Sequence, residues 1–560
     1  MNTLSCIFKP SKRSKTLLLR FVLTLSFFLL VACSDVETNK LSEPEITAEG
    51  IPTVDVSHRV MSGEFSLLNE EAPIPPQCYT KTEAKHNPCY VCHQRYTDRD
   101  TTYRMNYLDD GGIQGEYLFS DIGVTNHWKN LFIDKTDWVE SIKDETIRSY
   151  IDEDNYSKLS NALVDDGWKG FIPDLENYNF GSDAFGADGF ALDGSAWVAF
   201  NYKPLPSTFW PTNGSTDDVV LRLPEIFRSN GGVFNKEIYQ LNLAILEVSF
   251  KQLSQIDIPV MDESILQLDL NQDGDITSDV AILKARTQYV GDASQVEVIA
   301  QQFPLNTELM HSVRYVGADE EGNIVVPQRM KELRYMKKIR DLNDSELQSR
   351  FARERKEKLT EELPTFNQHG DEGFSNGLGW LVQGFIENYD GDLRPQSYEE
   401  QMFCMGCHSA IGSTVDSTFS FARKVTGVAG WSYINLKGMK DAPSRTQTEG
   451  EILQYLKRSG GGHEFRENKE MFDRWYLADG TVDETKVKQA DVYALITPSL
   501  DKALEMNKAY TYIVRHQSYI HGRDANTKPA KNVYEHIDES NPPLDVEFQL
   551  FDWDIQLDWP

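Results

Sequence analysis

Two stretches with one pattern decide how this chain is interpreted: Cys89-Tyr90-Val91-Cys92-His93 and Cys404-Met405-Gly406-Cys407-His408. Each is a Cys-x-x-Cys-His run, the pattern of a c-type haem attachment site. Two thiols three positions apart add to the two vinyl groups of one haem, and the histidine that follows ligates the iron. We therefore predict two covalent c-type haems, attached through the four cysteines, with the two histidines as proximal iron ligands.

The same four cysteines also form a Cys-x2-Cys…Cys-x2-Cys set, which is a pattern of structural zinc sites. Zinc motifs usually close short loops, whereas these two pairs lie 315 positions apart in the chain. Zinc also does not require a histidine after each pair. The sequence therefore favours haem over zinc.

The N-terminus indicates export followed by lipid attachment. Basic residues lead into an apolar stretch at residues 17–32, as in a secretory signal. The stretch ends Leu30-Val31-Ala32-Cys33, which resembles the bacterial lipobox, and this resemblance implies that Cys33 becomes the acylated first residue of the mature protein. Residues 33–60 are polar and acidic, which predicts a flexible tether. We expect a lipid-anchored protein outside the cytoplasm, on the outer membrane, facing the periplasm or the surface.

The net charge indicates which kinds of partner this protein binds, and the cysteine count indicates which thiol remains free. The formal net charge of −31 excludes binding to nucleic acid through a basic field and favours redox partner proteins in the periplasm or at the surface. Once the signal, the lipid and the haems have used six of the 7 cysteines, Cys78 remains without a disulfide partner. We interpret it as a free thiol, with an unusual iron ligand as the alternative.

The order of patterns along the chain predicts an α+β fold. We expect a haem 1 region at residues 61–135, a large mixed α/β insert at 136–395, and a mainly helical haem 2 domain at 396–560. Strands are predicted at 219–223, 296–300 and 312–316 from apolar and β-branched runs. Helices are predicted at 330–363, with a break near residue 343, and at 500–521. Ten Lys/Arg against six Asp/Glu at residues 330–358 predict a solvated helix face, with a docking surface for an acidic partner or pairing with the acidic remainder of the chain as the alternatives.

The insert also carries an EF-hand-like calcium loop at residues 269–280. Oxygen side chains stand at the ligand positions and Gly274 at the sharp turn, but Val280 replaces the final glutamate. The predicted calcium ligands are Asp269, Asn271, Asp273, Asp275 and Asp279. A surface turn that binds no ion is the alternative.

The sixth ligand of each iron decides whether a haem transfers electrons or performs chemistry, and the sequence leaves several candidates. For haem 1 the candidates are His86, Met105, His127 and His311. For haem 2 the candidates are Met439, His463, Met471, His516 and His521. Arg523 is a candidate partner for a haem propionate.

With its two haem motifs and its lipobox, the chain resembles the broad family of di-haem c-type cytochromes. This resemblance implies an electron-transfer protein anchored outside the inner membrane. A di-haem peroxidase or oxidase with one open haem is the first alternative, although the motifs of those families usually lie closer together. A ligand-binding redox lipoprotein, in which the insert holds a ligand, is the second.

Overall fold

The computed structural model describes residues 50–54, 69, 72–94, 104–109, 115–207, 210–360, 366–445, 447–460, 469–551 and 553–560. All of them belong to one compact unit, Glu45–Pro560. The signal segment, Cys33 and most of the tether therefore lie outside the described residues. Within the unit, helices and antiparallel strands are mixed, which confirms the α+β class of the fold.

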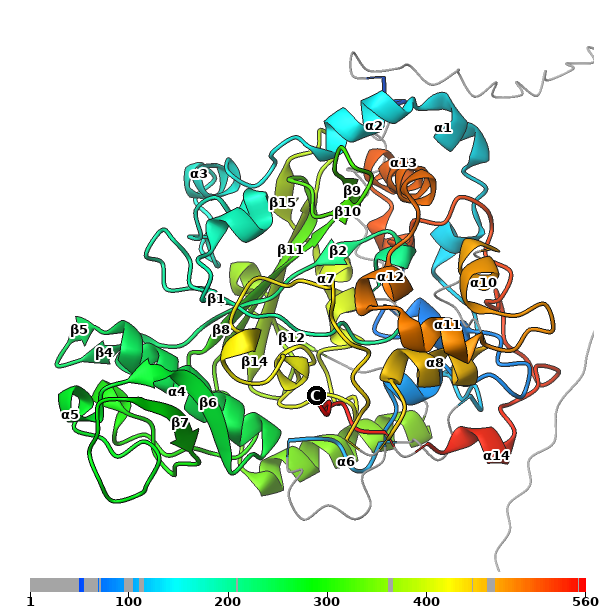
Figure 1. Cartoon of the computed structure of the whole chain (residues 1–560). Helices are drawn as coiled ribbons and strands as arrows, with labels where there is room; N and C mark the ends of the chain where they lie inside the picture. The colour runs from blue at the N-terminus through cyan, green and yellow to red at the C-terminus, as the bar shows by residue number, and fades with distance from the viewer. Residues whose placement is uncertain are drawn as a thin grey trace, which may run out of the picture. The chain divides into compact units, whose positions relative to one another are not determined.

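A nine-stranded antiparallel sheet forms the centre of the unit (Figure 1). Its order is β1-β3-β8-β11-β14-β13-β12, with β15 beside β14 and β2 beside β8. The strands are β1 (Val198–Ala199), β2 (Thr216–Asp217), β3 (Val220–Arg222), β8 (Glu308–Arg314), β11 (Met330–Lys338), β12 (Asn367–Gln368), β13 (Phe374–Ser375), β14 (Trp380–Glu387) and β15 (Leu393–Pro395).

The two faces of the sheet have different surroundings, because successive side chains of a strand point to opposite faces. Leu333 and Tyr335 of β11 pack in a hydrophobic cluster on one face, where Phe171 stacks on Tyr335. On the other face the register aligns Arg334 with His311 of β8. The side chains on this second face line a cavity.

Three small hairpins and thirteen described helices surround this sheet. The hairpins are β4–β5 (Ser229–Asn230, Val233–Phe234), β6–β7 (Gln255–Met261, Val280–Lys284) and β9–β10 (Gly317–Ala318, Ile324–Val325). The helices are α1 (Thr136–Ser141), α2 (Asp144–Ile151), α3 (Leu159–Asp165), α4 (Lys236–Lys251), α5 (Glu263–Leu266), α6 (Asp344–Thr360), α7 (Tyr398–Met405), α8 (Glu451–Ser459), α10 (Lys469–Trp475), α11 (Glu484–Gln489), α12 (Val492–Ile496), α13 (Leu500–His516) and α14 (Val546–Gln549). Helices α8 and α10–α12 lie to one side of the sheet, and α4 with β6–β7 to the other (Figure 1).

The predicted helix at 330–363 is wrong in its first part. Residues 330–338 form β11, a central strand paired with β8 and β14, and only α6 is helical. Apolar residues recur there at a spacing that fits a helix, and the charged residues between them suggested a solvated face. In the structure Lys331, Glu332 and Lys338 are buried instead, because their strand lies in the centre of the sheet.

The other element predictions are partly right. Strands β3 and β8 overlap the runs predicted at 219–223 and 312–316, whereas residues 296–300 form a loop with a single bridge at Glu297. Helix α13 ends at His516, earlier than predicted, because Gln517 adopts a left-handed conformation with φ 45°. In the part of the chain that the structure describes, we find no helix of the length and hydrophobicity that a membrane span requires.

Candidate functional site

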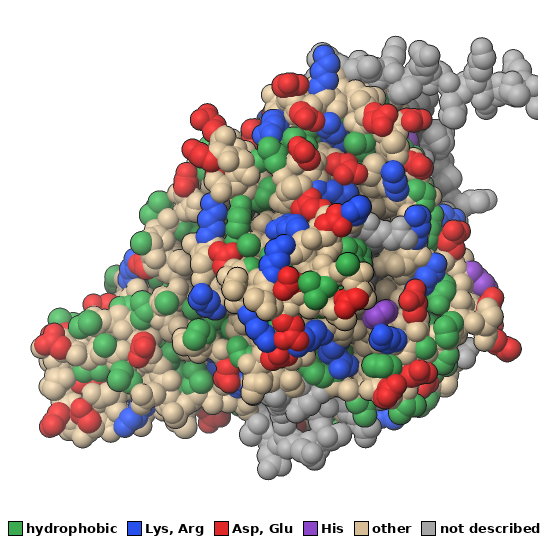
Figure 2. All heavy atoms as spheres, turned by 45° about the vertical axis from the view of Figure 1, so that its right-hand side comes forward, with side chains coloured by type: hydrophobic (Ala, Val, Ile, Leu, Met, Phe, Trp, Pro, Cys, Tyr) green, Lys and Arg blue, Asp and Glu red, His purple; other side chains and the backbone are tan. Residues whose placement is uncertain are grey.

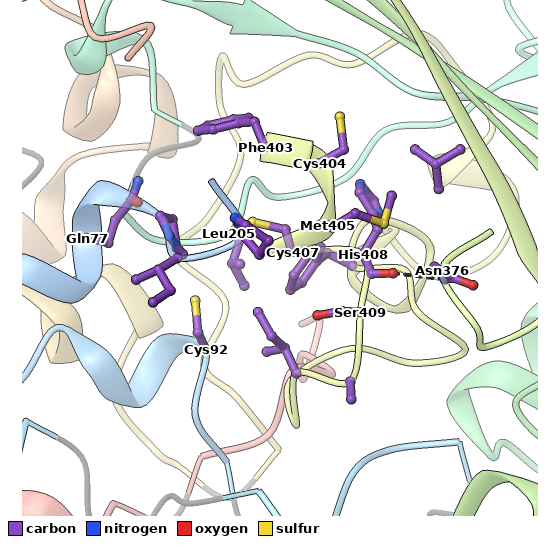
Figure 3. Close-up of a pocket in the computed structure, with 18 of the residues that line it drawn as sticks. Gln77, Cys92, Leu205, Asn376, Phe403, Cys404, Met405, Cys407, His408 and Ser409 are labelled. Carbon is purple, nitrogen blue, oxygen red and sulfur yellow. Dashed lines mark hydrogen bonds between the residues drawn. The ribbon is translucent and has the colours of Figure 1, made fainter. Parts of the chain in front are cut away.

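Both Cys-x-x-Cys-His motifs open onto one cavity of about 740 Å³. Its walls combine the segment around Cys89, the end of α7 with the loop that follows, and the face of β8 and β11 described above. Figure 3 shows Cys92 and Cys407 with their sulfur atoms directed into the same open space. The wide separation of the motifs in sequence is therefore not a separation in space.

The two motifs share one backbone conformation. In the first, a 3-10 turn at Cys89–Val91 lets the Cys89 carbonyl accept the backbone N–H of Cys92 (3.1 Å) and of His93 (3.0 Å). In the second, at the end of α7, the Cys404 carbonyl accepts the N–H of Cys407 (3.2 Å) and of His408 (2.9 Å). Such a turn brings both cysteines and the histidine of a motif to one side of the backbone.

Each motif histidine is held at its Nδ1 atom by an oxygen. His93 Nδ1 lies 3.3 Å from Oδ1 of Asp109, whose carboxylate is buried. His408 Nδ1 lies 3.1 Å from the backbone carbonyl oxygen of Ser417. An Nδ1–H that donates to a carboxylate or a carbonyl fixes the tautomer in which Nε2 carries the lone pair, as in metal-ligating histidines.

The two motifs are also joined directly. The N–H of Ser413, just past the second motif, donates to the Cys92 carbonyl (3.3 Å), and the N–H of Gly412 donates to Asp109 (2.8 Å). A Cβ on Gly412 would lie 2.3 Å from the Gln94 carbonyl oxygen, and one on Gly406 would lie 2.5 Å from that of Pro73. Glycine is therefore required at both positions, where the second motif meets the backbone around the first.

A cationic cluster forms the sheet side of the cavity. Glu332 accepts hydrogen bonds from Nε of Arg334 (2.8 Å), Nη1 of Arg523 (2.6 Å) and the amide of Gln396 (3.1 Å). Arg523 lies 4.7 Å from the centre of the Phe403 ring, next to Cys404. Two guanidinium groups against one carboxylate leave a surplus positive charge on the cavity wall, which suits a bound carboxylate.

Burial governs the protonation of the motif side chains. It raises the pKa of the Cys407 thiol to about 12 and raises the pKa of Cys404 as well, because a thiolate is disfavoured in apolar surroundings. It lowers the pKa of His408 to about 4. The thiols are protonated and the imidazole is neutral at pH 7, which is the state that thioether formation and iron ligation start from.

Of the predicted sixth ligands that the structure describes, His311 lines the cavity, and it does so beside the second motif rather than the first. His463 lies outside the described residues. His516 stacks on Tyr512 and bonds its carbonyl (2.7 Å), and Met439 packs in the core. The remaining described candidates do not line the cavity either: His86, Met105, His127, Met471 and His521.

Neither the cysteines nor the predicted calcium loop forms a cluster for a bare metal ion. In the described ranges, no group of three or more His, Cys, Asp or Glu side chains is arranged to hold one, so the four thiols do not surround a common point as tetrahedral zinc requires. Within the loop, the N–H of Gly274 donates to Asp269 (3.0 Å) and that of Asp275 to Asp273 (2.9 Å). The turn exists, and calcium binding there stays a prediction.

Comparison with known proteins identifies the family to which this chain belongs. A family model whose description reads ":-like lipoprotein" matches residues 62–494. An uncharacterized lipoprotein of Aquifex aeolicus (strain VF5) is 32% identical over 525 residues, which cover 82% of this chain and 86% of the relative. The chain belongs to this family of bacterial lipoproteins, which fits a lipid-anchored protein outside the cytoplasm. No solved protein structure matches it.

Several residues of the site were not found from sequence. Asp109 follows the first motif at no diagnostic spacing, and Ser417 contributes only its backbone carbonyl. Glu332 and Arg334 were assigned to a solvated helix. The alternation of side chains in β11 was the one signal that could have placed them on the face of a strand.

Proposed function

We propose that this lipoprotein is a di-haem c-type cytochrome that transfers electrons in the periplasm or at the outer membrane. The observation that carries the proposal is the matched geometry of the two motifs. Both open onto one cavity, and both histidines are held at Nδ1 by an oxygen acceptor. A four-cysteine zinc site has no histidine ligand, and a plain thiol pair needs no histidine held in this way.

The residues of the cavity fit a haem in three respects. The four motif thiols would form the thioether bonds, and His93 and His408 would ligate the irons through Nε2. Arg334 and Arg523 would hold propionate carboxylates beside Cys404. A haem bound in this way supplies reversible one-electron oxidation and reduction of its iron.

The protein around the motifs would keep water away and set the potentials. Tyr90 is fully buried and packs edge-on against Phe551 at 4.9 Å, so the first motif is enclosed by the C-terminal segment. Two haems held in this one cavity would lie close together, so electrons would pass between them without a further carrier. In the proposed function the haems exchange electrons with redox partner proteins, and the lipid at Cys33 holds the protein at the membrane.

The proposal is tested on the full chain expressed in a bacterium that matures c-type cytochromes. We expect the intact mass to include two haems and the reduced protein to show c-type absorption bands. A variant with Cys89→Ala and Cys92→Ala should lose one haem. The matched control is Cys78→Ala, because Cys78 lines the same cavity but belongs to neither motif. Purified protein that carries zinc and no haem would overturn the proposal.

A second candidate is a di-haem peroxidase or oxidase with one open iron. It is favoured by the placement of the predicted ligands, since none of the described candidates for the first haem other than His311 lines the cavity, and His311 lies beside the second motif. A high-spin ferric haem that binds cyanide and turns over peroxide would favour this candidate. Two low-spin haems inert to peroxide would favour the electron carrier.

A further inference from the structure

His311 has the position expected of a residue that binds a ligand in the cavity. It stands in the middle of β8, on the face of the sheet that lines the cavity. Its Nδ1 atom is buried and has no hydrogen-bond partner among the described residues. A buried polar atom without a partner destabilises the folded state, so an imidazole placed in this way is expected to bind a group in the cavity.

Its neighbours place His311 at the second motif. The register of β8 and β11 sets it directly opposite Arg334. Electrostatic interactions link His311 with His408, and link Arg334 with Cys404, Cys407 and His408. The wall formed by His311 and Arg334 therefore faces the thiols and the histidine of residues 404–408.

We propose that His311 is the sixth iron ligand of the haem attached at Cys404 and Cys407. This inference rests on the proposed function, because it needs a haem at the second motif. His408 on one side of the ring and His311 on the other would close both axial positions. A haem with two imidazole ligands is low-spin and suited to electron transfer rather than to binding peroxide.

The location of His311 on a strand strengthens the assignment. β8 is hydrogen-bonded to β11, β3 and β2, so its backbone is held in a continuous ladder. A ligand on such an element keeps its distance from the iron in both oxidation states, which lowers the cost of reorganisation on electron transfer. Arg334, its cross-strand neighbour, supplies the positive charge that a propionate of the same haem would meet.

The test compares electronic spectra and electron paramagnetic resonance of the purified holoprotein with those of His311→Ala. We expect one of the two haems to change from low-spin to high-spin in the variant, and added imidazole to restore the low-spin signal. The mass of the haem peptide with residues 404–408 shows that the haem is still attached. Both haems keeping their spin state in the variant would overturn the inference.

Two further variants keep the test decisive. His311→Met should give the spectrum of a histidine–methionine haem with a raised potential, and it retains an apolar side chain if the alanine variant fails to fold. His127→Ala is the control, since His127 is half-buried and lies outside the cavity. It should leave both spectra unchanged.

Failure of this inference and failure of the proposed function give different results. If the wild-type protein carries no covalent haem, the proposed function fails before His311 is tested. If it carries two haems and the His311 variants leave both spin states unchanged, only the axial assignment fails.

Discussion

Replacing Glu332 by glutamine should destabilise the protein by about 3 kcal/mol at pH 7. Burial alone would raise the pKa of this carboxyl, but the guanidinium groups of Arg334 and Arg523 lower it from 4.5 to about 2. At about 1.4 kcal/mol per pKa unit, the ionised form is favoured in the folded state by about 3 kcal/mol. Breaking a buried ion pair by removing one partner costs a similar amount, about 3–5 kcal/mol.

The pH dependence of this loss has a defined sign. Because the folded-state pKa of Glu332 is depressed, its stabilisation is complete above pH 4.5 and is lost as the pH falls toward 2. The difference between wild type and Glu332→Gln should therefore shrink from about 3 kcal/mol at pH 7 to about 2 kcal/mol at pH 3.5. Urea unfolding of the holoprotein at both pH values measures it.

A matched control is Glu346→Gln, because Glu346 pairs with Arg340 at the surface of α6. An exposed pair contributes little to stability because water and salt screen it, so this variant should unfold nearly as the wild type does. A loss below about 1 kcal/mol in Glu332→Gln at pH 7, or a loss that is the same at both pH values, would refute the reasoning.

The remaining predictions concern the first motif, the sheet and the lipid. Asp109→Asn removes the carboxylate at His93, so the imidazole becomes a weaker electron donor to the iron. A redox titration should then show the potential of the haem at Cys89 raised by roughly 60–120 mV. Gly384→Ala places a Cβ 2.5 Å from Oε1 of Gln396, and denaturation should show a loss of about 1–3 kcal/mol. Cys33→Ser should move the protein from the membrane fraction to the soluble periplasmic fraction.

The sequence indicated which residues belong to the candidate site better than it indicated how they are arranged. The motif residues could be named because the attachment of a haem requires their types and spacing. The lipoprotein character was equally readable from the lipobox, and the comparisons confirm it. What the sequence did not indicate is that the two motifs share one cavity, since this depends on long-range contacts such as the bond between Ser413 and Cys92.

The error at residues 330–338 has a physical cause at the same site. Charged residues between apolar ones normally lie in solvent, so Lys331, Glu332 and Arg334 favoured an exposed helix. In the fold Lys331 and Glu332 are buried on a central strand, and Glu332 pairs with Arg334, which faces the cavity. A prediction from the local sequence pattern fails where charged side chains are buried, and such failures are expected at functional sites.

Different groups accept the hydrogen bond from Nδ1 of the two motif histidines, and this difference predicts a direction for the proposed electron transfer. A buried carboxylate holds His93, whereas a backbone carbonyl holds His408. The carboxylate would make its imidazole the more basic ligand, and a haem bound at Cys89 and Cys92 would then have a more stable ferric state and a lower potential. Arg334 and Arg523 lie beside the other motif, and their positive charge would raise the potential of a haem bound there because it disfavours the more positive ferric iron. Both effects would increase the difference in potential between the two haems in the same direction, so we expect electrons to pass from the haem of the first motif to the haem of the second.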